Sequence, residues 1–356
     1  MEYVDRVNNT IGPELQAYYE KTMLGQAVQS TMFDKYFSIQ KTQPLNSTET
    51  IKFRKWINMS ELYFGANNVN ATLTGNTTAD GERSAVLTTT DAYSDFVLPE
   101  GSSGDSKASM KYVELESSVF AIGDWMPYTE EIDLLHPVWT VKETAKQMGE
   151  MAGNILDGYY RDQLVNGAGH AYDISAGGAA ADSVDDAAFT NAFRKLYVEL
   201  KLSMAQPISS VLTSSTDVGT TPIRASYIAV GHPVASNLLL DNASFVPVEK
   251  YAAGTTLLEG EVGTLGQFRI IENENAPLTD ETGGVYKATF IVMGKDHSAQ
   301  VPLRGKNRME FIFQGIGSAG IADPLKRKGT LGWKTWLGSK TLYPERLGVV
   351  TALVQF

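Results

Sequence analysis

The sequence predicts an α+β fold, and three patterns support this prediction. Residues 136–166 have sustained helical periodicity. Several short apolar runs in the second half are typical of strands, with too few helices between them for a doubly wound parallel sheet. Residues 49–118 are rich in Thr, Asn, Gly and Ser and indicate a β-structured excursion. A chain of 356 residues, 43% of them hydrophobic, is long enough for about two domains with a buried core.

Composition excludes several classes of function. The net charge is −11 and the pI is about 5.0, whereas proteins that bind nucleic acid sequence-specifically are usually basic. Because cysteine is absent, the chain has neither disulfides nor thiolate chemistry. No apolar run approaches the ~18 residues of a membrane span, and the first residues lack the pattern of a signal peptide. We therefore expect no membrane association and a protein that is used in, or assembles from, the cytosol.

The first part of the chain contains no pattern that closes a core by itself. Residues 1–48 are interpreted as an N-terminal arm with one helical piece that begins near Pro13. Residues 49–117 begin with a predicted strand, in which apolar and charged residues alternate: Ile51, Lys52, Phe53 and Arg54. A long two-stranded ribbon is marginal alone and needs a neighbour, either the parent domain or another subunit. The alternative interpretation of residues 49–117 is a flexible insertion without a packing partner.

Two helices are predicted in the middle of the chain. The first covers residues 136–166, with Pro137 in its first turn, and would be roughly 45 Å long at ~1.5 Å per residue. Asn166-Gly167 is a suitable stop, and residues 167–183 are interpreted as a Gly- and Ala-rich linker. The second helix covers about residues 184–204. Its apolar face comprises Phe189, Phe193, Leu196 and Leu200.

Strands are predicted where short apolar runs are bounded by turn residues. These runs are Tyr227–Val230, Phe268–Ile271, Ala288–Val292, Met309–Phe313 and Leu347–Val354. A short helix is expected over Pro233–Leu240.

Gly315–Gly320 matches the dinucleotide-binding fingerprint GxGxxG and follows a predicted strand. That site needs a helix directly after the glycines, whose N-terminus would hold the pyrophosphate. Asp323-Pro324 and then Gly329 follow instead, so no helix is expected. We interpret the glycines as a tight chain reversal that returns Trp333 and Trp336 toward the core, and we expect no cofactor.

The remaining candidates for chemistry also have structural interpretations. The histidines are too far apart in sequence for a metal motif, and capping or packing roles are expected for His136, His170, His232 and His297. An acidic cluster ahead of the long helix could do acid–base work, but its position favours capping of the helix start; it comprises Glu130, Glu131 and Asp133. The sequence therefore predicts no catalytic residues, no metal site and no enzyme.

Positive charge is concentrated near the C-terminus of this acidic chain. A solvated face is the default interpretation of Lys326, Arg327 and Lys328, and inter-subunit ion pairs or weak contacts to nucleic acid are the alternatives. Together with Lys52 and Arg54, these residues are our candidate inter-subunit contacts.

Several motifs occur in a family order along nearly the whole chain. They are Gly12–Tyr19, Thr50–Arg54, the stretch around His232-Pro233, Gly260–Arg269, Gly294–Asp296 with Val301–Leu303, and finally Gly317–Gly320, Asp323–Leu325 and Gly329–Lys334. In these segments the chain resembles the major capsid proteins of tailed bacteriophages, specifically the family of the large-virion-polymerase podoviruses and their relatives. Residues 60–115 depart from that family, because they are longer and more polar than its pattern.

The resemblance implies the tailed-phage major capsid fold. Its parts would be an N-terminal arm (1–48), an extended β loop (49–117) that lies on a neighbouring subunit, a peripheral domain (118–169 and 301–356) with residues 136–166 as spine helix, and an axial domain (170–300). The protein would be structural and would self-assemble into hexamers and pentamers of an icosahedral shell around double-stranded DNA, which it contacts non-specifically.

The resemblance also implies partners and a location. The partners are a portal protein, possible decoration proteins and, since no ~100-residue helical segment precedes the arm, a separate scaffolding protein. The location is the virion capsid, after assembly in the host cytoplasm. Three other classes stay open: an encapsulin-type compartment shell, a nucleotide-dependent oxidoreductase built on Gly315–Gly320, and a monomeric β-rich adhesin. Neighbouring portal and terminase genes, nicotinamide or flavin binding, and a persistent monomeric state would discriminate among them.

Overall fold

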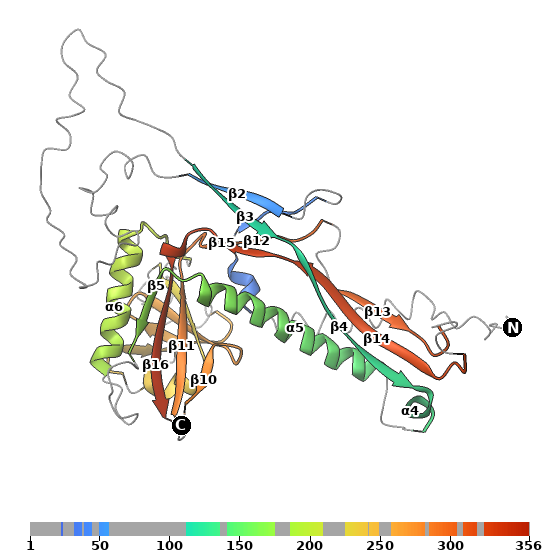
Figure 1. Ribbon diagram of the computed structural model, residues 1–356. Coiled ribbons are helices and arrows are strands. Elements are labelled where there is room, and N and C mark those ends of the chain that lie inside the picture. The colour runs from blue at the N-terminus through green and yellow to red at the C-terminus, as the bar shows by residue number, and fades with distance from the viewer. Residues whose placement is uncertain are drawn as a thin grey trace, which may run out of the picture. The chain divides into compact units, whose positions relative to one another are not determined.

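The computed structural model describes most of the chain outside the arm and the ribbon tip. The described residues are 23, 32–37, 39–44, 50–56, 112–135, 141–174, 186–208, 225–240, 242–248, 258–281, 285–304, 309–318 and 324–355. They belong to two compact units (Figure 1). Unit 1 contains residues 1–51, 117–163 and 298–340, and unit 2 contains residues 52–116, 164–297 and 341–356. Helices and strands are mixed, which confirms the predicted α+β class.

Unit 1 is built on an antiparallel sheet that packs against one long helix. The strand order is β13-β14-β4, with bounds Glu310–Gln314, Lys328–Leu337 and Phe120–Thr129. The helix α5 spans Val141–Asn166 and runs along the sheet in Figure 1. One buried cluster joins the two, with Ala145, Met148, Ala152 and Leu156 from α5 and Phe311, Leu331, Trp333 and Leu337 from the sheet.

The predicted long helix is present, and it ends at Asn166 as expected. It is described from Val141 on, and the expected start at residues 136–140 lies outside the described part of the chain. At ~1.5 Å per residue α5 is roughly 39 Å long. The prediction that Glu130 and Glu131 cap this helix is wrong. They form the first turn of a separate helix, α4 (Glu130–Leu135), which ends ahead of Pro137 because proline disfavours helical conformation in the preceding residue.

Part of the N-terminal arm is described, and it lies on unit 1. Its elements are the 3-10 helix η1 (Phe33–Tyr36) and the strand β1 (Ile39–Gln40). β1 pairs in parallel with β12 (Ser298–Gln300), which in turn neighbours β15 (Ser339–Thr341). The helical piece predicted from Pro13 falls outside the described residues.

Unit 2 contains a mixed sheet with the order β5-β16-β11-β6-β9-β8-β7, and β10 also pairs with β11. The strand bounds are His170–Asp173 (β5), Leu347–Gln355 (β16), Val285–Met293 (β11), Tyr227–Gly231 (β6), Phe268–Glu272 (β9), Glu261–Leu265 (β8), Phe245–Pro247 (β7) and Leu278–Asp280 (β10). Every strand predicted from an apolar run is present, including Met309–Phe313 as β13.

Helix α6 (Asp186–Leu202) supplies much of the core of unit 2. Its predicted apolar face is confirmed, because Phe189, Phe193, Leu196 and Leu200 are all buried. They share one cluster with Phe268 and Phe290 of the sheet. The short helix predicted from Pro233 is present as η5 (Pro233–Ala235) followed by α7 (Ser236–Leu240).

Two segments differ from their predicted placement. The first residues of the expected linker 167–183 form strand β5, because they pair in parallel with Gly348–Thr351 of β16. The expected C-terminal segment 301–356 is divided between the units. Residues 341–356 belong to unit 2, since β16 pairs along its length with β11 and so lies inside that sheet.

Candidate assembly surfaces

The base of the ribbon is a two-stranded sheet of β2 (Thr50–Trp56) and β3 (Tyr112–Ser118). Its apolar residues Ile51 and Phe53 are buried. The predicted strand is therefore confirmed, with its apolar residues on one face and its charged residues on the other. At its base the ribbon buries the apolar face against its own chain. Residues 57–111, for which a neighbour was expected, lie outside the described part of the chain.

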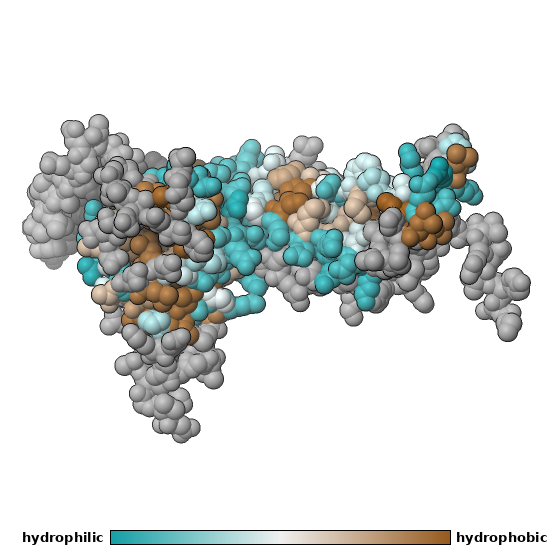
Figure 2. Space-filling model, turned by 90° about the horizontal axis from the view of Figure 1, so that it is seen from below, coloured by the Kyte–Doolittle hydropathy of each residue, from teal (hydrophilic) through white to brown (hydrophobic). Residues whose placement is uncertain are grey.

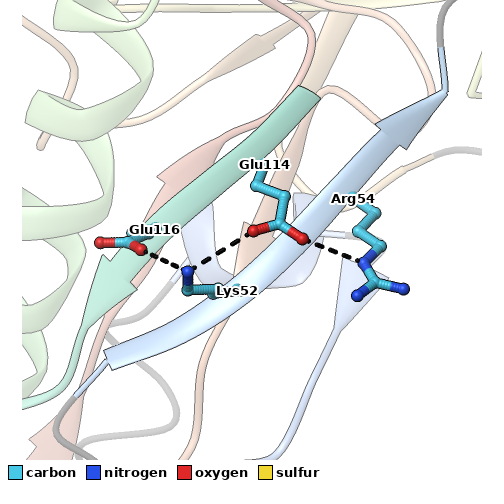
Figure 3. A network of polar contacts seen from close by, with 4 residues as sticks. All are labelled: Lys52, Arg54, Glu114 and Glu116. Atoms are coloured by element: carbon cyan, nitrogen blue, oxygen red, sulfur yellow. Dashed lines mark hydrogen bonds and ion pairs between the residues drawn. The ribbon is translucent and has the colours of Figure 1, made fainter. Parts of the chain in front are cut away.

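The opposite face of the ribbon carries alternating charges (Figure 3). Lys52 Nζ lies 3.0 Å from Glu116 Oε1 and 3.5 Å from Glu114 Oε2, and Arg54 Nε donates to Glu114 Oε1 at 3.3 Å. Hydrogen bonding and charge from Glu116, followed by those from Glu114, raise the pKa of Lys52. These four residues form what we call the charge ladder. Two of our candidate contacts, Lys52 and Arg54, thus have carboxylate partners within the chain.

We expect Lys52→Glu to loosen the ribbon base, because a third carboxylate would face Glu114 and Glu116. Amide hydrogen exchange in β2 and β3 should become faster, and added salt should reduce the difference from wild type because exposed charges are screened. The control Lys52→Gln removes the attraction without adding repulsion and should have the smaller effect. A Lys52→Glu effect that is insensitive to ionic strength would show that the ladder does not act through charge.

Lys55 of β2 also holds the base of the ribbon against other residues of unit 2. Lys55 Nζ pairs with Glu345 Oε1 at 2.6 Å and lies 4.5 Å from the ring centroid of Tyr343. On the same ring, the guanidinium carbon of Arg346 lies 4.1 Å from the centroid. A tyrosine ring flanked by two cations is a stabilising arrangement because the ring faces carry negative potential. These contacts fix the start of the ribbon against the turn that precedes β16.

The basic residues near the C-terminus lie where the chain enters β14: Lys326 and Arg327 directly precede the strand, and Lys328 is its first residue. Lys326, Arg327 and Lys328 are exposed, as predicted. The backbone N–H of Glu130 donates to the Arg327 carbonyl at 2.9 Å, and the Arg327 guanidinium pairs with Glu131. The segment is therefore joined to α4 by a backbone hydrogen bond and by an ion pair.

The two joined segments expose large apolar side chains. Leu134 and Leu135 of α4 are 72% and 74% exposed, and Leu325 beside the basic residues is 77% exposed. In Figure 2, apolar surface lies next to hydrophilic surface at the α4 end of unit 1. We define the tip surface as these three leucines and the charged residues Glu130, Glu131, Lys326, Arg327 and Lys328. These are two acidic and three basic residues, so the surface does not share the net charge of −11 that the whole chain carries.

A buried acidic residue on α5 holds the N-terminal arm. The Asp157 side chain is fully buried, and its Oδ1 accepts hydrogen bonds from the backbone N–H groups of Met32 (2.8 Å) and Phe33 (2.7 Å). It thereby caps the start of η1 from a distance of more than 100 residues in the sequence. One face of α5 is also open to the arm at Gly149, where a Cβ would overlap the Met23 carbonyl.

The GxGxxG pattern has the structure of a turn. Ser318 N donates to the Gly315 carbonyl at 3.1 Å, and Gly317 has a φ of 85°, which favours glycine. The next described residues are a turn and then strand β14, so no described helix stands where a phosphate would need one. β13 and β14 are antiparallel, which confirms the predicted chain reversal. Trp333 returns to the core, whereas Trp336 stays 36% exposed.

The histidines within the described residues pack and cap. His232 Nδ1 accepts from Val234 N at the start of η5, and His170 Nδ1 lies 2.9 Å from a Glu199 carboxylate oxygen. His297 is fully buried, and His136 lies outside the described residues. Within the part of the chain that is described, no group of three or more histidine or acidic side chains is arranged to hold a metal ion. No helix there is both long enough and apolar enough to span a membrane.

Sequence reasoning missed the residues that hold the arm and those that form the tip. A signal for the first was present. Gly149, Gly153 and Asp157 follow one another at intervals of four and so lie on one face of α5, where the missing side chain at Gly149 leaves room for the arm. The tip leucines had no comparable signal, since Leu134 and Leu135 read equally well as core residues of a helix.

Comparison with known proteins identifies the fold. No family model and no curated protein matches the chain. Solved capsids do match: that of Ralstonia phage GP4 (TM-score 0.59, 12% identity, 92% of this chain and 92% of that chain), that of cyanophage P-SCSP1u (0.57, 11%, 90% and 87%) and the mature capsid of bacteriophage PhiM1 (0.54, 14%, 90% and 86%). The chain therefore has the tailed-phage capsid fold that its sequence motifs predicted.

Proposed function

We propose that the chain is the major capsid protein of a tailed bacteriophage, a structural protein without enzymatic activity. Hexamers and pentamers of it would form an icosahedral shell around double-stranded DNA. The observation that carries this proposal is the match to phage capsids over about nine tenths of the chain. The net charge of −11 agrees with a container that does not adhere to the DNA packed inside it.

In this proposal the two units would be the domains of a shell subunit. Unit 1, with α5 as the spine helix, would be the peripheral domain. Unit 2 would be the axial domain around the hexamer and pentamer centres, and it would include residues 341–356 with β16. The ribbon that starts from β2 and β3 would extend onto a neighbouring subunit. Within the described residues of its two strands, Ile51 and Phe53 are buried whereas Tyr112 and Val113 are exposed, which supports a separate partner for the rest of the ribbon.

The proposed contacts between subunits involve the charge ladder and the tip surface. A chain of net charge −11 repels its own copies, so close approach is favoured where charge is locally balanced. Neither surface carries the net negative charge of the whole chain: the ladder has two acidic and two basic residues, and the tip has two acidic and three basic ones. Lys52 and Arg54 would contribute from the ladder, and Lys326, Arg327 and Lys328 would contribute from the tip.

Further partners follow from the same proposal. A scaffolding protein would guide assembly in the host cytoplasm, a portal protein would occupy one vertex, and decoration proteins could bind outside the shell. Packaged DNA would be contacted without sequence specificity. The mature location would be the virion capsid.

Electron microscopy of the purified full chain, alone and together with its scaffolding protein, tests the proposal. We expect rings, sheets or closed shells. A protein that stays monomeric under every condition would contradict it. The nearest alternative, an encapsulin-type compartment, would also give shells, but these would enclose a cargo protein and would not depend on a portal or on DNA packaging.

Deletion of residues 60–112 tests the role of the ribbon. We expect the variant to remain a soluble folded protein and to form no shells, because the removed segment would lie on another subunit. Circular dichroism checks the fold, and electron microscopy checks assembly. Normal shells from the deletion variant would refute the inter-subunit role, while leaving the capsid proposal itself intact.

A further inference from the structure

The turn that binds Lys55 has a second set of contacts, which it makes with the interior of unit 2. This turn, which we call the anchor turn, consists of Tyr343 and the 3-10 helix η9 (Pro344–Arg346). The backbone N–H of Gly169 donates to the Pro344 carbonyl at 2.9 Å. The chain at the start of β5 therefore lies directly against the anchor turn.

His170, the first residue of β5, bridges helix α6 and the anchor turn. Its Nδ1 lies 2.9 Å from Glu199 Oε2 of α6, and its Nε2 lies 3.2 Å from the backbone carbonyl oxygen of Glu345. The side chains of His170 and Glu199 are each 11% exposed. In such a largely water-excluded place a hydrogen bond is stronger, and the loss of one is more costly, than at the surface. One imidazole ring thus connects the core helix of unit 2 with the residue that pairs with Lys55.

Glu345 is contacted at both its side chain and its backbone. The carboxylate pairs with Lys55 Nζ of β2 at 2.6 Å, and the backbone carbonyl faces His170 Nε2. The Lys55–Glu345 pair is less exposed than the pairs of the charge ladder, so solvent screens it less. The place of the Glu345 backbone therefore decides where its carboxylate meets the ribbon.

We propose that His170 is a positioning residue for the ribbon. By holding the Glu345 backbone against α6, it sets the point at which Lys55 is bound and with it the direction in which the ribbon leaves unit 2. The path runs from Glu199 through His170 and Glu345 to Lys55, and each of its contacts is 3.2 Å or shorter.

The consequence for assembly rests on the proposed function, in which the ribbon lies on another subunit. A change of direction at the base of a ribbon displaces its far end much more than the base itself. The contacts of Glu345 would therefore decide which surface of the neighbouring subunit the ribbon reaches.

Two replacements of His170, each of which keeps one of its two contacts, test the proposal. The amide nitrogen of glutamine reaches about as far as Nε2 and can donate to the Glu345 carbonyl, whereas that of asparagine reaches only as far as Nδ1, on the Glu199 side. The readout is amide hydrogen exchange in β2 and β3 of the unassembled full-length chain. We expect His170→Asn to lower their protection by roughly threefold to tenfold, as for the loss of about one hydrogen bond, and His170→Gln to keep most of it.

A double-variant cycle tests whether His170 acts through Glu345. Lys55→Met removes the ion pair with Glu345, keeps the apolar stem and should lower the protection of β2 and β3 by itself. Adding His170→Asn should then lower it little further, because two residues that act through one partner have non-additive effects. The matched control is His232→Asn, which changes another capping histidine of unit 2 and should leave the protection of β2 and β3 unchanged.

Several outcomes would overturn the positioning role. One is a loss of protection in the interior strand β11 alone, since His170 would then serve only the core of unit 2. Others are an equal loss in His170→Gln and His170→Asn, a full sum of the two losses in the double variant, or the same loss in the His232→Asn control. None of these measurements requires shells, so this role and the capsid proposal fail separately.

Discussion

Replacing Glu261 with alanine is expected to destabilise unit 2 by about 3–5 kcal/mol, because it leaves a buried charge without its partner. The side chains of Glu261 and Arg269 are 0% and 2% exposed. Arg269 Nε donates to Glu261 Oε1 at 2.8 Å, and a second guanidinium nitrogen lies 2.5 Å from Oε2. This two-point contact joins strands β8 and β9, whose connecting turn places Gly266 at a φ of 64°.

The buried pair also organises its surroundings. Glu261 Oε2 accepts a hydrogen bond from Leu258 N at 3.0 Å, so loss of the carboxylate frees the backbone ahead of β8 as well. The double variant Glu261→Leu with Arg269→Leu should regain much of the stability, because removing both charges is far less costly than stranding one of them. Urea unfolding of the unassembled chain measures both variants.

A surface ion pair in the same unit provides the matched control. Lys287 Nζ pairs with Asp173 Oδ2 at 2.7 Å, but these side chains are 30% and 44% exposed. Asp173→Ala should therefore cost no more than about 1 kcal/mol. If Glu261→Ala lowers the free energy of unfolding no more than Asp173→Ala does, burial does not increase the contribution of the Glu261–Arg269 pair to stability.

The elements that could be predicted from the sequence are those whose apolar residues recur at regular spacing or form an uninterrupted run. The buried face of α6 was readable because its four large apolar residues recur at helical spacing, and strand β6 was readable as a short apolar run. Strand β14 was not predicted, since glycine, lysine and threonine interrupt its apolar residues. Gly329 and Gly332 are needed where Tyr128 and Trp125 of β4 approach closely, and such approaches depend on a partner strand that is some 200 residues away.

The assembly surfaces were predicted only in part. Five basic residues were singled out from charge alone, and three of them, Lys52, Arg54 and Arg327, have acidic partners within the chain. Pairing between distant segments cannot be read from local charge, because it depends on which strands become neighbours. The same limit hid the role of Asp157, whose partners lie more than 100 residues away.

Replacing Leu134 and Leu135 together with aspartate is expected to abolish shell formation and to leave the subunit folded. Both side chains are more than 70% exposed, so the subunit itself loses little packing. In a shell, burying one leucine contributes about 1.5–3 kcal/mol, and this contribution recurs at every copy of the contact. The aspartates would replace it with charges that must lose their water, next to the acidic residues Glu130 and Glu131.

The matched control is the double variant Leu134→Met with Leu135→Met, which keeps the surface apolar and similar in volume and should still assemble. Thermal unfolding of the unassembled subunits should be nearly the same for both variants, which separates an assembly defect from a folding defect. Electron microscopy and light scattering against protein concentration measure assembly. Shells from the aspartate variant at the wild-type threshold concentration would show that the tip surface stays in solvent, and the self-contacts would then have to lie elsewhere, with the charge ladder as the next surface to test.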